Sequence, residues 1–312
     1  MFAGAQAPVA PLPDAARPVF GALSLVLAAA LFALAAAMAK RAGQLSGISA
    51  VEMVFFRYLA GFVAIGSWAL IRHLDVRPRR LDYVALRVGL NIVAVTLLYM
   101  GVQATTVTKA NMLNMTYPVF VFALAPLVNR EKNRPANLLW LLLALAALYL
   151  IILPRFSSVN RGDLLSLLSA VVMGAAVPIL RESRKYDTSV SIMFSLTLVG
   201  SVVTFLLSLP HFFLPGGPAL LFLLGSAAAG SAGQVLVTAG YRHVRAATGS
   251  LLESSRIVFG SLLGALFFAE VLTLRLLVAA LLLLAAQLGA TERFRGLRFR
   301  GGGRGRLPPG LK

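Results

Sequence analysis

The feature that most constrains this chain is a series of ten apolar windows, each close to 20 residues long, separated by short polar breaks. A helix needs about 20 mainly apolar residues to cross a bilayer. Hydrophobic residues make up 59% of the chain and charged residues only 13%, more apolar surface than a soluble fold can bury. We therefore predict an all-α membrane protein with ten transmembrane helices over residues 20–39, 50–71, 84–103, 110–129, 137–154, 162–180, 188–209, 218–240, 247–269 and 272–290.

The positive charges predict how these helices are oriented. With a cytoplasmic N-terminus, 20 of the 29 Lys and Arg residues fall in cytoplasmic connections and termini, six fall on the opposite side, and three lie inside helices. Because positive segments resist translocation, both termini are predicted to be cytoplasmic. The net charge of +18 then reflects topology and the basic tail, so nucleic acid is not an expected partner. We expect that tail to lie near the anionic lipids of the inner leaflet.

Several kinds of chemistry are not expected in this chain. It has no cysteine, which excludes disulfides and thiolate metal sites. Its three histidines, His73, His211 and His243, lie at or beside connections between the predicted helices. The sequence contains no nucleotide-binding loop and no His–Asp or Cys–His cluster. We therefore expect no metal, no cofactor, no catalytic residues and no enzymatic activity.

The two halves of the chain align without gaps at an offset of 139 residues. At this offset Gly61 falls on Gly200, and Gly101 falls on Gly240. Each half contains five predicted helices, an odd number, so the second half must enter the membrane in the opposite orientation. The predicted organisation is a cytoplasmic segment over 1–19, inverted five-helix repeats over 20–154 and 155–290, and a basic disordered tail over 291–312.

Charged residues interrupt two of the predicted helices. Glu52 and Arg57 lie in VEMVFFRYLAGF, and Glu253 and Arg256 lie in TGSLLESSRIVFGSLLGALFF. A charge at the centre of a spanning helix costs roughly 2.5 to 3.5 kcal/mol on insertion scales, so such residues usually face a protein interior or a wet cavity. Two interpretations remain open: a fixed cluster of interhelical polar contacts, or a hydrated central pocket that binds a polar solute.

Neighbouring helices supply further polar side chains at similar depth. At the 139-residue offset, Asn114 corresponds to Glu253. By contrast, the windows 137–154 and 272–290 carry almost no polar residues and are predicted to face lipid or a second subunit of a homodimer. Glu253 and Glu52 are candidates for proton coupling, although facilitated diffusion is equally compatible with the sequence. The predicted substrate-binding residues are Arg57, Tyr99, Asn111, Asn114, Tyr117, Gln234, Glu253 and Arg256.

Three segments carry a family resemblance: FFRYLAG in the second helix, and YPVFVFALAPLVNREK and RIVFGSLLGALFFAEVL at the fourth helix of each half. The chain resembles the EamA-type ten-helix transporters of the drug/metabolite transporter superfamily. This resemblance implies alternating access by two inverted repeats around a central cavity. It also implies small metabolites such as amino acids as substrates, often exported.

Taken together, the sequence predicts a multi-pass protein of the cytoplasmic membrane. Its predicted function is secondary transport of a small polar metabolite, an amino acid or a related zwitterion or organic ion, and the family resemblance implies export. The predicted partners are that metabolite and membrane lipids. The alternative is a membrane sensor that transports nothing, or a scramblase of lipid headgroups.

Overall fold

The computed structural model describes residues 17–130, 135–152 and 160–269, together with isolated helical residues between 274 and 289. Most of the predicted tenth helix, the N-terminal segment up to residue 16 and the tail lie outside these residues. The described helices are α1 (Arg17–Ser46), α2 (Ala50–Ile71), α3 (Leu81–Ala104), α4 (Val107–Asn114), α5 (Tyr117–Asn129), α6 (Pro135–Ile152), α7 (Arg161–Tyr186), α8 (Ser189–Ser208), the 3₁₀ turn η1 (Leu209–His211), α9 (Gly217–Gly240), α10 (Ala246–Glu253) and α11 (Arg256–Phe268).

Eight segments of the described chain are long and apolar enough to span a membrane. They correspond to the predicted helices other than the fifth and the tenth. The fifth appears as α6, of which the described apolar part is the shorter stretch Leu138–Ala147. Leucine side chains on the outside of the bundle are extensively exposed, with Leu127 78% and Leu70 76% accessible. Exposed apolar surface of this kind suits contact with lipid. The number of ten helices and their orientation remain predictions.

Side-chain caps determine where two of the helices begin. Ser49 and Glu52 form a reciprocal capping box at the start of α2, and Asn160 and Asp163 form another at the start of α7. Each box satisfies backbone N–H groups that have no partner within the helix. The polar breaks between the apolar windows therefore define helix starts as well as connections.

Two predicted helices, 110–129 and 247–269, are each divided by a two-residue turn. Met115 and Thr116 separate α4 from α5, and Ser254 and Ser255 separate α10 from α11. Pro118 follows the first turn and has no N–H to donate. In the second turn the Ser254 N–H bonds to the Leu251 carbonyl, three residues back rather than four. Tightening of the backbone thus interrupts α10–α11 without a proline.

The divided helices match one another at the 139-residue offset. Adding 139 to the bounds of α4 and α5 gives the bounds of α10 and α11. Both pairs also end at a non-glycine residue with positive φ, Arg130 and Ala269, each at φ 53°. The two halves therefore share their local backbone structure at the positions where the polar residues lie, which supports the predicted duplication.

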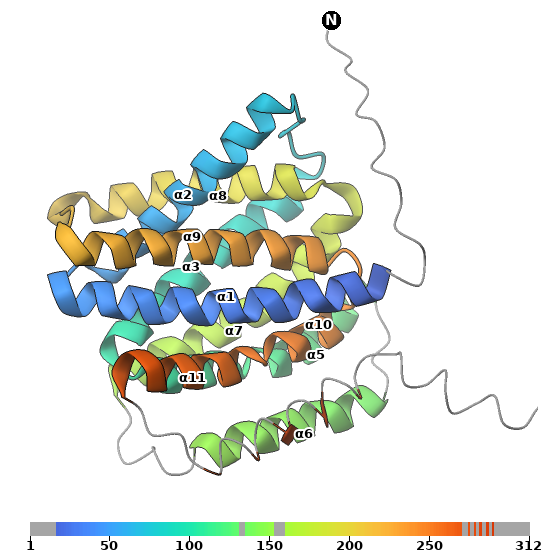
Figure 1. The fold of residues 1–312 in the computed structure, drawn as a ribbon. Helices are drawn as coiled ribbons and strands as arrows, with labels where there is room; N and C mark the ends of the chain where they lie inside the picture. Colours follow the sequence, from blue (N-terminus) through green and yellow to red (C-terminus); the bar gives the residue numbers. More distant parts are fainter. Residues whose placement is uncertain are drawn as a thin grey trace, which may run out of the picture.

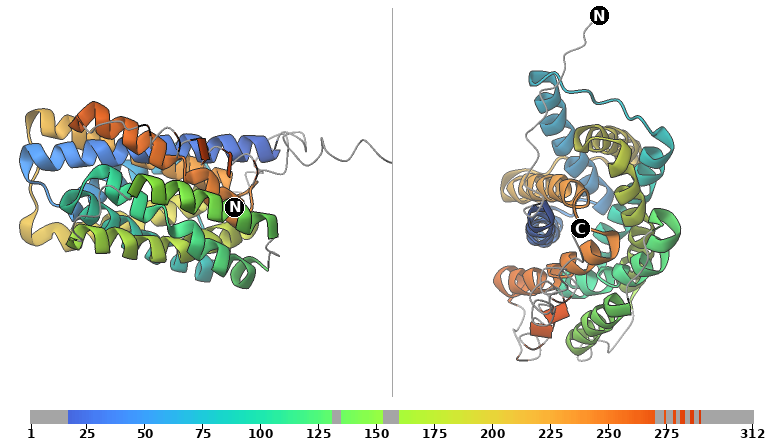
Figure 2. Two further views of the ribbon diagram at one scale, coloured as in Figure 1. Left: turned by 90° about the horizontal axis from the view of Figure 1, so that it is seen from below. Right: turned by 90° about the vertical axis from the view of Figure 1, so that its right-hand side faces the viewer.

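Helices of the two halves interleave rather than forming separate bundles. In Figures 1 and 2, α1 lies against α9, α2 against α8, and α3 against α7, while α6 lies at the edge. A Cβ on Gly61 would lie 2.7 Å from Thr197 Cγ2, and one on Gly200 would lie 2.7 Å from Tyr58 Cγ. These contacts exchange under the 139-residue offset, since Tyr58 corresponds to Thr197. A local two-fold relation thus links α2 and α8.

Candidate functional site

Arg57 of α2 points into the bundle at the contact between the halves. Its side chain is 5% exposed, and its Nη2 lies 3.5 Å from Gln234 Oε1 of α9. Its guanidinium carbon is 5.1 Å from the centre of the Phe32 ring and 5.9 Å from that of Tyr99. Gly230 of α9 makes room for this side chain, because a Cβ there would lie 3.0 Å from Arg57 Cδ.

Arg256, the first residue of α11, approaches the same aromatic ring. Its guanidinium carbon lies 5.3 Å from the Phe32 centroid, and its side chain is 6% exposed. Cation–π contacts of this kind contribute about 0.5 to 2 kcal/mol each. Phe32 of α1 therefore lies beside two arginines, one from each half of the chain. Phe32 is absent from the binding residues predicted from the sequence, because an aromatic residue in an apolar helix gives no distinguishing signal.

Arg87 of α3 is a third buried arginine, 1% exposed, and it too is absent from the predicted binding residues. It lies within electrostatic range of Tyr58, Glu253, Tyr241 and Tyr117. The signal was present in the sequence, since an arginine inside a predicted membrane helix is expensive. Arg57, Arg87 and Arg256 are hereafter called the arginine cluster.

Glu253 ends α10 and is the acidic member of this region. It lies within electrostatic range of Arg256 and Arg87, and near Tyr241 and Tyr117. No ion pair joins it to the arginine cluster in the part of the chain that the structure describes. Arg256 thus lies near Arg57, and Glu253 lies near Arg256 and Arg87.

The other predicted binding residues differ in the hydrogen bonds that they make. Tyr99 Oη is 3.5 Å from Ser226 Oγ, and Tyr117 Oη is 3.5 Å from the Ser250 carbonyl oxygen. Asn111 and Asn114 make shorter hydrogen bonds, to residues that are not among the predicted binding residues. The Asn111 amide donates to the Val107 carbonyl within α4, and the Asn114 amide donates to Ser169 Oγ of α7 at 2.9 Å.

Many buried polar atoms of this region have no protein partner among the described residues. They include donors of the arginine cluster, which cannot act as acceptors. Buried polar groups in proteins are nearly always hydrogen-bonded, so these atoms require water or a ligand. The atoms are Arg87 Nε and Nη1, Arg256 Nε, Asn91 Nδ2, Gln234 Nε2, Asn111 Oδ1 and Asn114 Oδ1.

Glu52, the second candidate for proton coupling, has a different environment. Its Oε2 accepts from the Ser49 N–H, and its Oε1 accepts from the Phe213 N–H at 2.6 Å. One carboxylate oxygen therefore caps the start of α2, and the other binds the backbone of the segment between η1 and α9. Within the described residues, no group of three or more His, Cys, Asp or Glu side chains could hold a metal ion.

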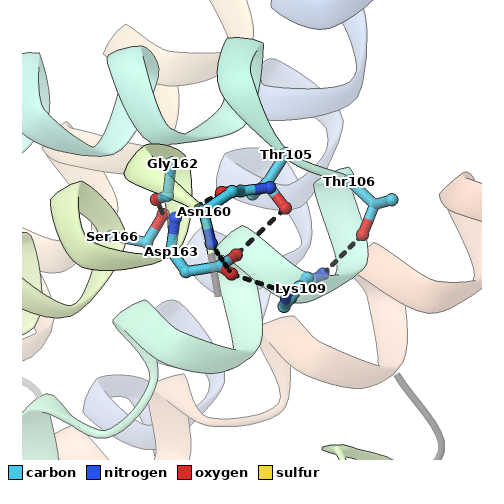
Figure 3. A network of polar contacts seen from close by, with 7 residues as sticks. All are labelled: Thr105, Thr106, Lys109, Asn160, Gly162, Asp163 and Ser166. Carbon is cyan, nitrogen blue, oxygen red and sulfur yellow. Dashed lines mark hydrogen bonds and ion pairs between the residues drawn. The ribbon is translucent and has the colours of Figure 1, made fainter. Parts of the chain in front are cut away.

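A second polar network, not predicted from the sequence, joins the end of α3 and the start of α4 to the start of α7 (Figure 3). Lys109 Nζ donates to Asp163 Oδ2 at 2.6 Å, and Thr105 Oγ1 donates to Asp163 Oδ1 at 3.1 Å. The Asn160 N–H also donates to Asp163 Oδ2. Lys40 of α1 donates to the carbonyl of Thr105. This group, hereafter the Lys109–Asp163 network, joins the first half of the chain to the second.

Comparison with known proteins identifies the family and the fold of the chain. The chain matches the EamA-like transporter family over residues 19–153 and again over 160–291. A solved crystal structure superposes with a TM-score of 0.72 at 16% identity, covering 91% of this chain and 99% of that one. At this identity the likeness concerns the fold alone.

Curated relatives are transporters from several kinds of organism. The chain is 25% identical over 299 residues to solute carrier family 35 member G1 of Homo sapiens, covering 88% of this chain and 80% of that protein. It is 29% identical over 259 residues to the pseudopaline exporter CntI of Pseudomonas aeruginosa (strain UCBPP-PA14), covering 80% and 88%. The riboflavin transporter of Rhizobium johnstonii is 25% identical over 279 residues, covering 88% and 92%.

These relatives point to a transporter rather than an enzyme, and the apolar helices make the chain a multi-pass membrane protein. Both family matches cover the segments that carry α4–α5 and α10–α11, where the polar residues gather. The chain therefore belongs to the EamA-like transporter family of the drug/metabolite transporter superfamily.

Proposed function

We propose that this chain is a secondary transporter that exports a small polar metabolite, an amino acid or a related zwitterion or organic ion, across the cytoplasmic membrane by alternating access. The observation that carries the proposal is the set of buried polar atoms without protein partners between the two halves. In an apolar bundle such atoms are costly unless a solute or water satisfies them.

The divided helices support a site at this position. Transporters bind solutes where spanning helices are interrupted near the membrane midplane and the backbone departs from regular helix. Here Asn114 and Tyr117 flank one interruption, and Glu253 and Arg256 flank the other. The predicted substrate-binding side chains thus lie on matching positions of the two repeats.

The interleaved halves support alternating access. Helices α2 and α8 meet through the reciprocal glycine contacts of Gly61 and Gly200, which allow close approach of the two helices. The Lys109–Asp163 network joins the halves at the end of the bundle where α3 ends and α7 begins. We propose that this contact closes one end of the pathway and must separate during the transport cycle.

The names of the relatives support a polar solute. One relative is a transporter of riboflavin, and another is an exporter of pseudopaline. The second name supports transport out of the cell. Together with the buried polar region, these names favour transport of a metabolite over a sensor that transports nothing and over a lipid scramblase.

The experiment that tests this function is solute flux in proteoliposomes containing the full chain, with a metabolite panel loaded on one side. We expect saturable flux of at least one polar metabolite. Glu253→Gln should reduce that flux at least tenfold while leaving membrane insertion intact. Arg72→Gln, at an exposed position, is the control. Lipid flipping without solute flux, or wild-type flux in Glu253→Gln, would overturn the proposal.

A pH gradient across the same liposomes distinguishes proton-coupled transport from facilitated diffusion. If Glu253 carries a coupled proton, an imposed gradient changes the flux of the wild-type protein, and Glu253→Gln abolishes that change. Flux that is insensitive to the gradient would establish facilitated diffusion instead. Glu52→Gln is a useful comparison, because the Glu52 carboxylate is already occupied by two backbone N–H groups.

A further inference from the structure

The arginine cluster carries more positive charge than its surroundings neutralise. Arg57, Arg87 and Arg256 are each no more than 6% exposed. Among the described residues, Glu253 is the acidic side chain within electrostatic range of Arg87 and Arg256. Arg57 and Arg256 repel each other as like charges. Formally, three cations and one anion leave two positive charges in excess.

Other buried charges of the described chain have their partners. The buried Lys109 is paired with Asp163 at 2.6 Å, and the buried Glu182 is paired with the exposed Lys185 at 2.6 Å. The Arg184 guanidinium donates to backbone carbonyls of Thr238 and Asp187. The excess is therefore local to the arginine cluster, and it does not reflect a general lack of counter-charges inside the bundle.

The protein compensates this excess only weakly. Phe32 presents its ring to both Arg57 and Arg256, at 5.1 and 5.3 Å. An aromatic face attracts a cation but does not cancel its charge. Arg87 Nε, Arg87 Nη1 and Arg256 Nε have no acceptor among the described residues. These N–H groups are the donors that bind planar carboxylates and phosphates, often in pairs.

The charge of the solute decides how well it suits this site. A zwitterion would leave the excess of two positive charges unchanged, and a monoanion would leave one. A solute with two acidic groups would bring the region to formal neutrality, which buried charges require for stability. We propose that the transported metabolite is an organic dianion bound by Arg57, Arg87 and Arg256.

This inference rests on the proposed transport function but is tested separately, by binding. Thermal unfolding of the purified full chain in detergent is followed with a matched series of dicarboxylates from succinate to pimelate, β-alanine as the zwitterion, propionate as the monoanion and putrescine as the dication. At equal concentration and ionic strength, we expect at least one dicarboxylate to bind at least tenfold more tightly than β-alanine, propionate and putrescine. Equal or tighter binding of β-alanine or putrescine would overturn the inference.

Variants connect this preference to the arginine cluster. Arg57→Gln and Arg256→Gln should each weaken dicarboxylate binding at least tenfold. They should also reduce the ratio between the affinity for the dicarboxylate and the affinity for propionate. Arg256→Lys, which retains the charge, should keep the preference for two acidic groups, and the exposed Arg72→Gln should leave it unchanged. Gel filtration in detergent confirms folding of each variant. Unchanged dicarboxylate binding in both glutamine variants would contradict the assignment.

Flux in proteoliposomes separates the failure of this inference from the failure of transport. Dicarboxylate binding without flux of any solute would uphold a dianion-binding site at the arginine cluster and refute the transport function. Flux of β-alanine with no dicarboxylate binding would uphold transport and refute the inference.

Discussion

The Lys109–Asp163 network and the arginine cluster are both buried and polar, yet they differ in how their groups are satisfied. In the first, the Asp163 carboxylate accepts from Lys109, Thr105 and Asn160. In the second, three guanidinium groups have no ion pair among the described residues, and several of their N–H groups have no acceptor. Completed networks stabilise a fold, whereas incomplete ones require a ligand. We therefore assign the first region to structure and gating, and the second to solute binding.

The largest effect on stability is expected in the completed network. Asp163→Asn removes the carboxylate partner of the buried Lys109 ammonium group. Breaking a buried ion pair typically destabilises by about 3 to 5 kcal/mol, because the remaining charge is no longer compensated. Chemical unfolding of the purified protein in detergent measures this change. A loss of unfolding free energy below about 1 kcal/mol would show that the Lys109–Asp163 network does little to stabilise the fold.

A smaller loss is expected where α3 crosses α7 beside the same network. A Cβ on Gly101 would overlap Ser166 Oγ and lie 3.0 Å from the Gly162 carbonyl oxygen. Gly101→Ala should therefore cost about 1 to 3 kcal/mol of unfolding free energy, as overpacking does in closely packed interiors. Gly89→Ala in the same helix is the control, since a Cβ there meets nothing within 4 Å. Equal stability of the two variants would argue against close α3–α7 packing.

The opposite response is expected in the arginine cluster. Arg87→Gln removes one charge from a region with an excess of positive charge, so the unfolding free energy should stay within about 1 kcal/mol of wild type or increase. Solute flux in proteoliposomes should nevertheless fall about tenfold, which corresponds to about 1.4 kcal/mol of lost solute stabilisation. A stability loss as large as that of Asp163→Asn would place Arg87 among the structural contacts.

The smallest effect is expected at an exposed ion pair. Arg80 Nη2 lies 2.7 Å from Asp82 Oδ2, and the two side chains are 44% and 59% exposed. Because water and salt screen such pairs, Arg80→Gln and Asp82→Asn should leave unfolding and solute flux unchanged within error. Either variant behaving like Asp163→Asn would mean that a short N–O distance predicts stability irrespective of burial.

Much of the fold could be predicted from the sequence because its main determinants are local. Apolar length defines the spans, and polar breaks such as Ser49–Glu52 define where helices begin. The turn within each fourth helix was not predicted as a break. In the second half, tightening of the backbone at Ser254 and Ser255 produces the turn without a proline, so the sequence carries no signal for it.

The candidate site was predictable only in part. Arg57, Glu253 and Arg256 are recognisable because charge inside an apolar helix is costly. Phe32 was not, because its role depends on two arginines from distant parts of the chain. Lys109 and Asp163 lie at helix ends, where charged residues are common, so only the tertiary arrangement of α3, α4 and α7 reveals that they pair.

The central claim is that the region beside Arg256 admits water and solute during transport. Because the chain contains no cysteine, Ser255→Cys introduces a single thiol at the α10–α11 turn. The measurement is the rate at which a small, membrane-permeant thiol reagent labels this cysteine in proteoliposomes. Thr204→Cys is the control, a buried position in α8 whose hydroxyl donates to the Gly200 carbonyl. We predict labelling at residue 255 that the transported solute slows, and negligible labelling at residue 204. Equal, solute-insensitive labelling at both positions, or none at residue 255, would contradict a solute site in this part of the protein.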